Sequence, residues 1–420
     1  MREMKDSGIE WIGKVPVEWK IDNPQYHFSQ RKDRAKQGMV QLTASQKYGV
    51  ITQTEYMERT GANIVTVQKD FDILKLVCAG DFVIHMRSFQ GGLEYSEKTG
   101  SISSAYVMLI PSNTIREPRY YKWFFKSSNY IDALSSTSNL ARDGQAMRWS
   151  NFIQLPILFP PAEEQQRIAD FLDAKCAEID ALTADIQTQI DTLEQYKRSV
   201  ITETVTKGLN PDAKMKDSGI QWIGNMPAHW DVIRGKYILR YMQKPVREDD
   251  GVITCFRDGE VTLRSNRRED GFTMSDKEIG YQGIDVGDLV VHGMDGFAGS
   301  IGISNSRGKA SPVLNVLDTD QCKRYIMYYL RSMAYSDVFL ALATGIRVRS
   351  CDLRWNKLAE LSYPVPPLDE QNAIVKHIDS VLSKADAVIA DKKAQLATLD
   401  EYKKSLIFEY VTGKKEVPTS

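Results

Sequence analysis

Few residues of the kinds that carry out catalysis occur in this sequence, and they do not gather into a recognisable motif. The five histidines are His27, His85, His229, His292 and His377. None of them stands at the spacing that two ligands of one metal ion need. Two of them, His85 and His292, each follow a short apolar run. We interpret these two as residues at a strand end, either at the edge of a core or facing a loop.

Two stretches come close to cofactor-binding motifs. The run from Gly302 to Lys309 departs from the phosphate loop G-x-x-x-x-G-K-[ST] by one extra residue and lacks the closing Ser or Thr. We interpret Gly296, Gly299 and Gly302 as a flexible loop. Residues 22–26 resemble the Asn-Pro-Pro-aromatic tetrad of adenine methyltransferases, but the second Pro and a Gly-rich cofactor loop are missing. A turn is the better account of that stretch. No catalytic or metal site is therefore predicted.

Bulk properties limit the classes of protein. A length of 420 residues predicts more than one domain, and the net charge of −1 excludes a globally basic nucleic-acid binder. The five cysteines are scattered and odd in number, which is typical of buried thiols in a reducing compartment. No apolar run reaches the ~18 residues that span a bilayer, and the first residues lack an apolar signal core. We expect a cytoplasmic protein.

The chain contains an internal duplication. Residues 4–19 (MKDSGIEWIGKVPVEW) and 215–230 (MKDSGIQWIGNMPAHW) are identical at eleven of sixteen positions. A second pair begins with Pro-Pro-x-x-Glu-Gln at residues 160–165 and 366–371, and ends in a Tyr-Lys-(Arg/Lys)-Ser element at residues 196–199 and 402–405. The order is therefore A-B-A′-B′, with a variable region inside each unit.

The variable regions share a skeleton. A Gly-Asp turn precedes an apolar run that ends in His at residues 80–85 and again at residues 287–292, which predicts a strand in each unit. The loops that follow, residues 86–92 and 293–300, differ between the two units. A duplicated scaffold with divergent loops indicates two readers of related design and different specificity.

Two long helices are predicted, because neither Pro nor Gly occurs between residues 162 and 207 or between residues 369 and 412. A heptad reading of the first helix gives Leu172, Ile179, Ile186, Leu193 and Val200 at a, with Ile168, Lys175, Leu182, Gln189 and Tyr196 at d. The second gives Ile378, Ala385, Lys392, Leu399 and Leu406 at a, with Ile374, Val381, Val388, Gln395 and Tyr402 at d, and Leu382, Ile389 and Leu396 beside the seam. This pattern is typical of a coiled coil, although a bundle element inside one domain is the alternative.

These patterns predict an α+β chain with two similar mixed α/β domains, separated by two long helices that form an antiparallel coiled coil with pseudo-two-fold symmetry. The predicted boundaries are 1–159 and 215–365 for the domains, 160–207 and 366–412 for the helices, 208–214 for the linker and 413–420 for the tail. Charge differs between the parts: residues 20–155 carry 17 basic and 12 acidic side chains, and residues 161–214 carry 6 and 11. Residues 231–360 are nearly neutral, so basic residues there would have to be gathered in space, such as Arg264, Arg267 and Arg268, or Arg347 and Arg349.

The repeated W-I-G-x-x-P-x-x-W element, the P-P-x-x-E-Q entry to each helix and the Tyr-Lys-(Arg/Lys)-Ser near each helix end resemble the specificity (S) subunits of type I restriction–modification systems. The resemblance covers nearly the whole chain. It implies two target-recognition domains that each read one half of a split, asymmetric DNA site. It also implies helices that set the spacer and dock two methyltransferase (M) subunits, with restriction (R) subunits joining later. The S-adenosylmethionine and ATP sites would belong to those partners, so this chain needs no cofactor.

Candidate DNA contacts follow from loop position and side-chain type, because Arg and Lys can read guanine, Gln can read adenine and Asp can accept from cytosine. In the first domain they are Lys47, Tyr48, Arg87, Ser88, Gln90, Ser103 and Ser104. In the second they are Arg257, His292, Asp295, Ser300, Lys309 and Ser311. A solvated loop residue is the alternative for each one.

Two other classes of function compete with a non-catalytic specificity subunit. A DNA methyltransferase with fused recognition domains would need a cofactor loop, which the sequence lacks. A coiled-coil scaffold without a role on DNA would leave the divergent, partly basic loops unexplained.

Overall fold

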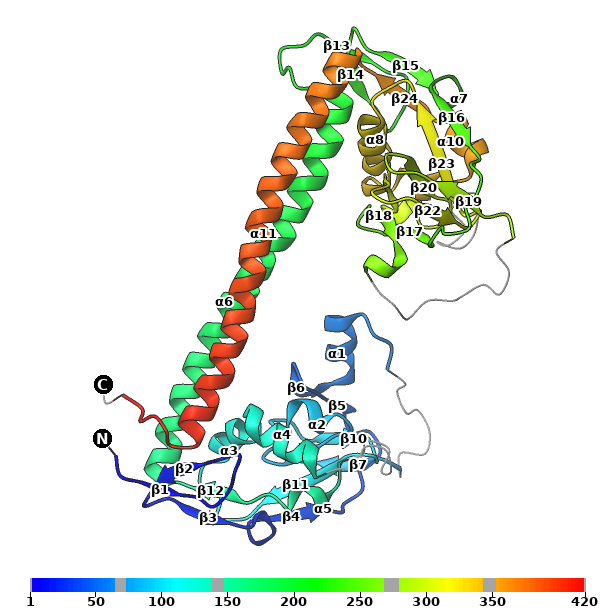
Figure 1. Ribbon diagram of the computed structural model, residues 1–420. Helices are drawn as coiled ribbons and strands as arrows, with labels where there is room; N and C mark the ends of the chain where they lie inside the picture. Colours follow the sequence, from blue (N-terminus) through cyan, green and yellow to red (C-terminus); the bar gives the residue numbers. More distant parts are fainter. Residues whose placement is uncertain (1, 65–72, 138–146, 268–278, 343–352, 419–420) are drawn as a thin grey trace. The chain divides into compact units, whose positions relative to one another are not determined.

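The computed structural model describes residues 2–64, 73–137, 147–267, 279–342 and 353–418. The chain forms two compact units, one of residues 1–186 and 394–420, the other of residues 187–393. Each unit combines antiparallel strands, short helices and a part of both long helices (Figure 1), so the α+β class is confirmed. In the described parts of the chain, no helix has an apolar stretch that could cross a membrane.

The first unit is built on one four-stranded antiparallel sheet in the order β4-β11-β8-β9. Four two-stranded ribbons surround it: β1–β2, β3–β12, β5–β6 and β7–β10. The strands are β1 Met4–Asp6, β2 Lys14–Pro16, β3 Lys20–Asp22, β4 Phe28–Arg31, β5 Leu42–Ser45, β6 Gly49–Thr52, β7 Lys75–Val77, β8 Phe82–Ile84, β9 Glu94–Tyr95, β10 Gly100–Ile102, β11 Val107–Pro111 and β12 Ile157–Phe159. The short helices are η1 Pro24–Tyr26, α1 Gln53–Thr60, α2 Ser88–Gly91, α3 Pro118–Phe124, α4 Ser128–Ser136 and α5 Trp149–Phe152.

The second unit repeats these strand orders, with a sheet β16-β23-β20-β21 and ribbons β13–β14, β15–β24, β17–β18 and β19–β22. The strands are β13 Met215–Asp217, β14 Asn225–Pro227, β15 Asp231–Arg234, β16 Leu239–Met242, β17 Ile253–Cys255, β18 Val261–Leu263, β19 Gln282–Ile284, β20 Leu289–His292, β21 Ile301–Ile303, β22 Gly308–Ala310, β23 Leu314–Thr319 and β24 Ser362–Val365. The short helices are α7 Gly235–Ile238, η3 Arg264–Asn266, η4 Gly296–Ala298, α8 Lys323–Tyr335, α9 Val338–Ala341 and α10 Trp355–Glu360.

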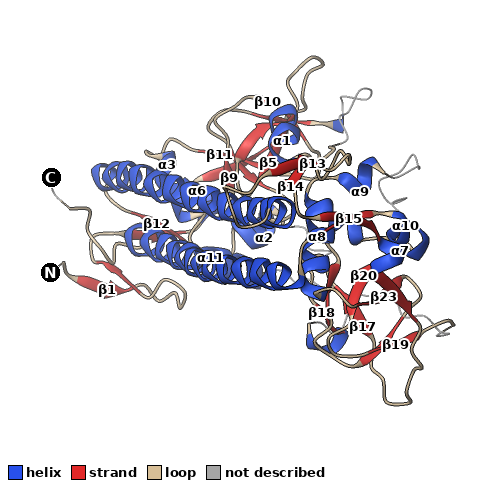
Figure 2. Ribbon diagram, turned by 90° about the horizontal axis from the view of Figure 1, so that it is seen from above, coloured by secondary structure: helices blue, strands red, loops and turns tan. Residues whose placement is uncertain are grey.

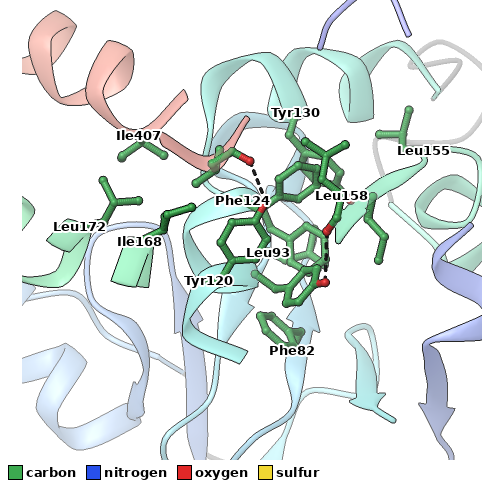
Figure 3. Packing of buried hydrophobic residues seen from close by; sticks show 14 of the residues in the cluster. Phe82, Leu93, Tyr120, Phe124, Tyr130, Leu155, Leu158, Ile168, Leu172 and Ile407 are labelled. Carbon is green, nitrogen blue, oxygen red and sulfur yellow. Dashed lines mark hydrogen bonds between the residues drawn. The ribbon is translucent and has the colours of Figure 1, made fainter. Parts of the chain in front are cut away.

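An aromatic core joins the sheet of the first unit to its helices. Phe82 on β8 and Tyr120 and Phe124 on α3 are fully buried in one cluster. Ile168 and Leu172 on the long helix α6 (Ala162–Lys207) belong to the same cluster, as Figure 3 shows. The Tyr120 hydroxyl donates to the main-chain carbonyl of Val411 at 2.7 Å. The globular part of the unit is therefore fastened to both long helices by packing and by a buried hydrogen bond.

The long helices α6 and α11 (Leu368–Val411) run in opposite directions inside each unit, and they lie side by side in both views (Figure 2). In the first unit, Phe171 packs on Tyr410 with ring centroids 4.5 Å apart, and Lys403 pairs with Asp180 at 2.5 Å. In the second, Lys197 donates to Asp386 at 2.6 Å, and the Lys392 ammonium donates to Gln189.

The predicted d column of the heptad seam is correct at the start of each helix, where Ile168 and Ile374 are buried, and wrong further along. The a positions through Ile186 and Ala385 are buried, but the predicted d residues Leu182 and Tyr402 are 47% and 54% exposed. The second column at the seam instead contains Cys176 and Ile190 on α6 and Ile389 on α11, which are buried, and Leu382, Leu396 and Lys403 on α11, which are half-buried. An apolar residue three or four places from another satisfies either register, so periodicity alone did not decide which side of the helix faces its partner.

The repeated motifs meet at the helix ends. The Trp19 indole donates to Glu164 at the start of α6 (2.9 Å), and the Trp230 indole donates to Glu370 at the start of α11 (3.1 Å). Gly413, just past the end of α11, has a φ of 68°, and a Cβ on it would stand 2.9 Å from the Trp19 ring. Each W-I-G-x-x-P-x-x-W element thus joins the beginning of one long helix to the end of the other.

Candidate nucleic-acid interface

A rigid turn precedes β8 in the first unit. Gly80 adopts a φ of 97°, and the Asp81 carboxylate accepts from the backbone N–H of Cys78 at 2.8 Å. Arg31 pairs with Asp81 at 2.7 Å. This ion pair raises the pKa of the Arg31 guanidinium. The strand therefore enters the loop from a fixed direction.

Inside that loop, the structure corrects the prediction for Ser88. Its side chain is fully buried, and its hydroxyl accepts from the backbone N–H of His85 at 2.9 Å, which leaves no surface for a ligand. His85 is also buried, 3.7 Å from the Glu94 carboxylate, so it belongs to the core edge. Arg87, just before α2, and Gln90, on α2, stay exposed and remain candidates.

A second group of candidates lies on the β5–β6 turn. The Gln46 amide donates to the carbonyl of Arg87 at 3.0 Å, so this turn lies against the loop after β8. The Lys47 ammonium and the Arg59 guanidinium stand 5.2 and 5.1 Å from the centre of the Tyr48 ring. The sequence did not point to Arg59, because only the packing of α1 on β6 brings it beside Tyr48. The turn lines an open hollow of about 730 Å³.

Ser103 and Ser104 lie apart from this hollow. They occupy the turn between β10 and β11, where the Ser103 hydroxyl accepts from the backbone N–H of Ala105 at 3.3 Å. Ser104 is exposed. The structure thus gathers Lys47, Tyr48 and the Arg87 loop, and it leaves the two serines in a separate turn.

The second unit brings four of the six predicted residues into one recess of about 660 Å³, named here the β20 recess. Its lining includes Arg257, Arg267, His292, Asp295 and Ser300. Arg257 donates to Asp295 at 3.0 Å, and both side chains stay accessible, at 68% and 38% exposure. The recess therefore places a guanidinium and a carboxylate next to each other on the surface.

His292 has a defined protonation pattern. The backbone N–H groups of Met294 and Asp295 donate to its Nδ1 atom at 3.2 and 3.0 Å. Burial lowers the pKa of His292, with the Asp295 charge opposing that effect. A neutral ring whose Nδ1 accepts must carry its proton on Nε2. The residue therefore offers one N–H donor to the recess.

Two further features complete the β20 recess. Ser300 is 1% exposed, and its hydroxyl has no hydrogen-bond partner. Arg267 lies over the Phe256 ring at 4.2 Å and pairs with Asp258 at 2.7 Å. Of the two expected basic clusters, only Arg264 and Arg267 can be placed. Arg268, Arg347 and Arg349 lie outside the described residues.

Lys309 and Ser311 lie outside this recess. Lys309 belongs to β22, where it faces Gly283 across the ribbon and donates its backbone N–H to Gly251 at 2.8 Å. Ser311 follows the same strand. Asp285 belongs to the same region. Its carboxylate accepts hydrogen bonds from Lys244, which has the larger effect, and from Arg307, and these bonds lower the pKa of Asp285 to about 2.

The near-miss motifs have structural roles. Gly302 lies in β21, and a Cβ there would stand 1.9 Å from the carbonyl oxygen of Gly259. The expectation of a flexible loop at Gly302 was wrong, since close backbone packing requires this glycine. Asn23 caps a turn as expected, because its side chain accepts from the N–H of Gln25 at 2.9 Å. Among the described residues, no group of His, Cys, Asp and Glu could hold a metal ion.

Comparison with known proteins agrees with this arrangement. Residues 27–192 match the family described as the type I restriction modification DNA specificity domain. The type I restriction enzyme MjaVIII specificity subunit of Methanocaldococcus jannaschii is 22% identical over 422 residues, which cover 96% of this chain and 94% of that protein. The putative MjaX specificity subunit of the same organism is 24% identical over 327 residues, or 74% and 72% of the two chains.

The fold also has a counterpart among solved structures. A chain from work on the complex assembly and conformational transition of the type I R-M system superposes with a TM-score of 0.68 at 14% identity, covering 96% of this chain and 99% of that one. The fold and the family match together define a protein that carries a DNA specificity domain. In sequence and in fold, the chain is similar to the specificity subunits of type I restriction enzymes.

Proposed function

We propose that this chain is the subunit that reads the DNA sequence for a type I restriction–modification complex, and that it has no catalytic activity of its own. One observation carries the proposal. Two units with the same strand orders present different side chains at the same place, the loop after β8 in one and after β20 in the other. Identical frames with different loops suit two readers of different half-sites.

The domain assignment follows the duplication. Residues 1–159 and 215–365 would be the two target-recognition domains, and residues 160–207 and 366–412 the helices of an antiparallel coiled coil. Residues 208–214 would be the linker and 413–420 the tail. The antiparallel contacts inside each unit and the equivalent Trp–Glu bonds support a pseudo-two-fold duplication. A coil of fixed length would hold the spacer between the half-sites constant.

The helices would also bind the enzymatic partners. Leu182 and Tyr402 are exposed in the first unit, and Tyr196 and Val388 are 51% and 44% exposed in the second. In an antiparallel pair of helices, a residue that directly precedes a seam position on one helix and its counterpart on the other helix lie on the same side of the pair. The opposite side, with Asp400, lines the hollow against the globular part. Two exposed patches that each combine a tyrosine with an aliphatic residue favour two copies of one partner, which we infer to be methyltransferase subunits.

The chemistry would then lie with those partners. Methyltransferase and restriction subunits would supply the S-adenosylmethionine and ATP sites, and each recognised half-site would direct one methyltransferase to flip out an adenine. The role of this chain is to position the DNA.

Methylome sequencing of a host that carries the system tests the proposal. We expect a bipartite motif with a constant spacer. Exchanging residues 20–155 for those of a related subunit should change one half of the motif and leave the other half and the spacer intact. An unchanged motif after this exchange would contradict the proposal, as would methyl transfer by the purified chain alone.

A further inference from the structure

The β20 recess presents donors and an acceptor in a defined arrangement. Arg257 stands on the β17–β18 turn and Asp295 precedes η4, and their side chains meet at 3.0 Å. The guanidinium uses Nη2 in this bond, so its other N–H groups remain to contact a ligand. A carboxylate that supports an arginine also holds it in one orientation, which reduces the entropy lost on binding.

His292 and Ser300 add to this surface. The imidazole offers its Nε2–H, because Nδ1 already accepts from two backbone N–H groups. Ser300 is 1% exposed and lines the same recess with a hydroxyl that lacks a partner. A buried unpaired hydroxyl is costly, and a ligand or water that bonds it would remove that cost. The recess is thus polar and offers hydrogen-bonding groups to a ligand.

The pattern of these groups matches one base pair better than the other. In the major groove, a G·C pair presents two acceptors on guanine followed by the N4 donor of cytosine. An A·T pair presents an acceptor, a donor and a second acceptor. Arg257 and His292 supply donors, and Asp295 supplies only acceptors beside Arg257. The two parallel N–H donors of a guanidinium fit two adjacent acceptors, which guanine presents and adenine does not, and the neighbouring carboxylate can then accept from cytosine N4.

We infer that the β20 recess reads a G·C base pair, with Arg257 donating to guanine and Asp295 accepting from the paired cytosine. This inference rests on the proposed function and deepens it. The equivalent loop of the first unit, residues 86–92, presents no such pair in the described structure, because Ser88 and the neighbouring His85 lie in the core and Arg87 and Gln90 are exposed. Readout by an Arg–Asp pair in this loop therefore belongs to one half-site only.

The test is methylome sequencing of hosts that carry the complete system with single substitutions in this chain. Arg257→Lys keeps the positive charge but loses the bidentate fork. We expect it to relax one G·C position in one half-site, with a loss of discrimination of about 5- to 150-fold. Asp295→Asn should relax the same position, because an amide can both donate to and accept from adenine.

The matched control is Arg240→Ala. Arg240 is a half-exposed arginine in the same unit that pairs with Asp318 and Asp320 on another strand pair, outside the recess. The control should retain the full motif. A motif unchanged in both Arg257→Lys and Asp295→Asn, or relaxed equally in the control, would overturn the inference. A wild-type host without any bipartite motif would overturn the proposed function itself.

Discussion

Replacing Tyr120 by Phe should weaken the attachment of the first globular part to the end of α11. Tyr120 is fully buried, and its hydroxyl donates to the Val411 carbonyl at 2.7 Å. The last four carbonyls of a helix lack partners inside the helix. Val411 is itself buried, so Tyr120→Phe would leave its carbonyl unsatisfied, at a cost of about 1–3 kcal/mol.

Tyr130→Phe is the matched control. Tyr130 is equally buried in the same cluster, but its hydroxyl has no hydrogen-bond partner. Its removal takes an unpaired polar group out of the core, so stability should stay constant or rise. Both substitutions remove one oxygen from a buried ring, and they differ only in the bond that is lost.

Thermal unfolding of the full chain measures the difference. For a body of 150–250 residues, each kcal/mol lowers the midpoint by about 2–4 °C. We expect Tyr120→Phe to lower the unfolding midpoint of the first unit, and Tyr130→Phe to leave that midpoint unchanged or raise it. Equal losses in the two variants, or no loss in Tyr120→Phe, would show that the hydrogen bond does not stabilise the attachment.

Three further predictions concern docking, packing and pH. Leu182→Ala combined with Tyr402→Ala should reduce co-purification of the methyltransferase partner at least tenfold, because aromatic residues dominate the binding energy of many interfaces. The unfolding midpoint of the chain should change little, since both side chains are exposed. Unchanged co-purification would show that these residues do not belong to the interface. Gly302→Ala should destabilise the second unit by about 1–3 kcal/mol or more, measured by denaturant unfolding, because the new Cβ would collide with the Gly259 carbonyl; wild-type stability would show that the strands separate easily. Lowered pH should destabilise the second unit as Asp285 takes up a proton, because the pKa of Asp285 in the folded chain, about 2, lies below its ordinary value of 3.8. This stabilisation is present above about pH 4 and is lost toward pH 2. Asp285→Asn should therefore flatten this part of the plot of unfolding free energy against pH.

Much of the architecture can be read from local sequence signals. The Pro-Pro entry, the absence of Pro and Gly and the glycine after each helix predict helices close to the observed Ala162–Lys207 and Leu368–Val411. The Gly-Asp turns before residues 82 and 289 likewise precede observed strands. These features depend on backbone preferences of neighbouring residues, so a linear sequence contains the information.

The sides of the helices and the surroundings of each loop residue depended on tertiary contacts. Leu182 and Tyr402 fit the seam by spacing, yet they face outward because packing selected another column. Ser88 is a polar loop residue of the kind expected at a surface contact, yet it is buried and hydrogen-bonded to the backbone. By contrast, Arg257, His292, Asp295 and Ser300 were named from their loops, and the fold brought them into one recess.

The repeated motifs separate what the sequence alone determines from what the tertiary structure decides. The sequence by itself determined that the chain repeats an A-B unit, because identity over sixteen residues needs no structure to be seen. Only the tertiary structure decided what the repeats do: Trp19 bonds Glu164 and packs on Gly413, nearly four hundred residues away along the chain. Local propensity specifies which elements form, whereas burial and hydrogen-bond satisfaction across distant segments decide which of their faces meet.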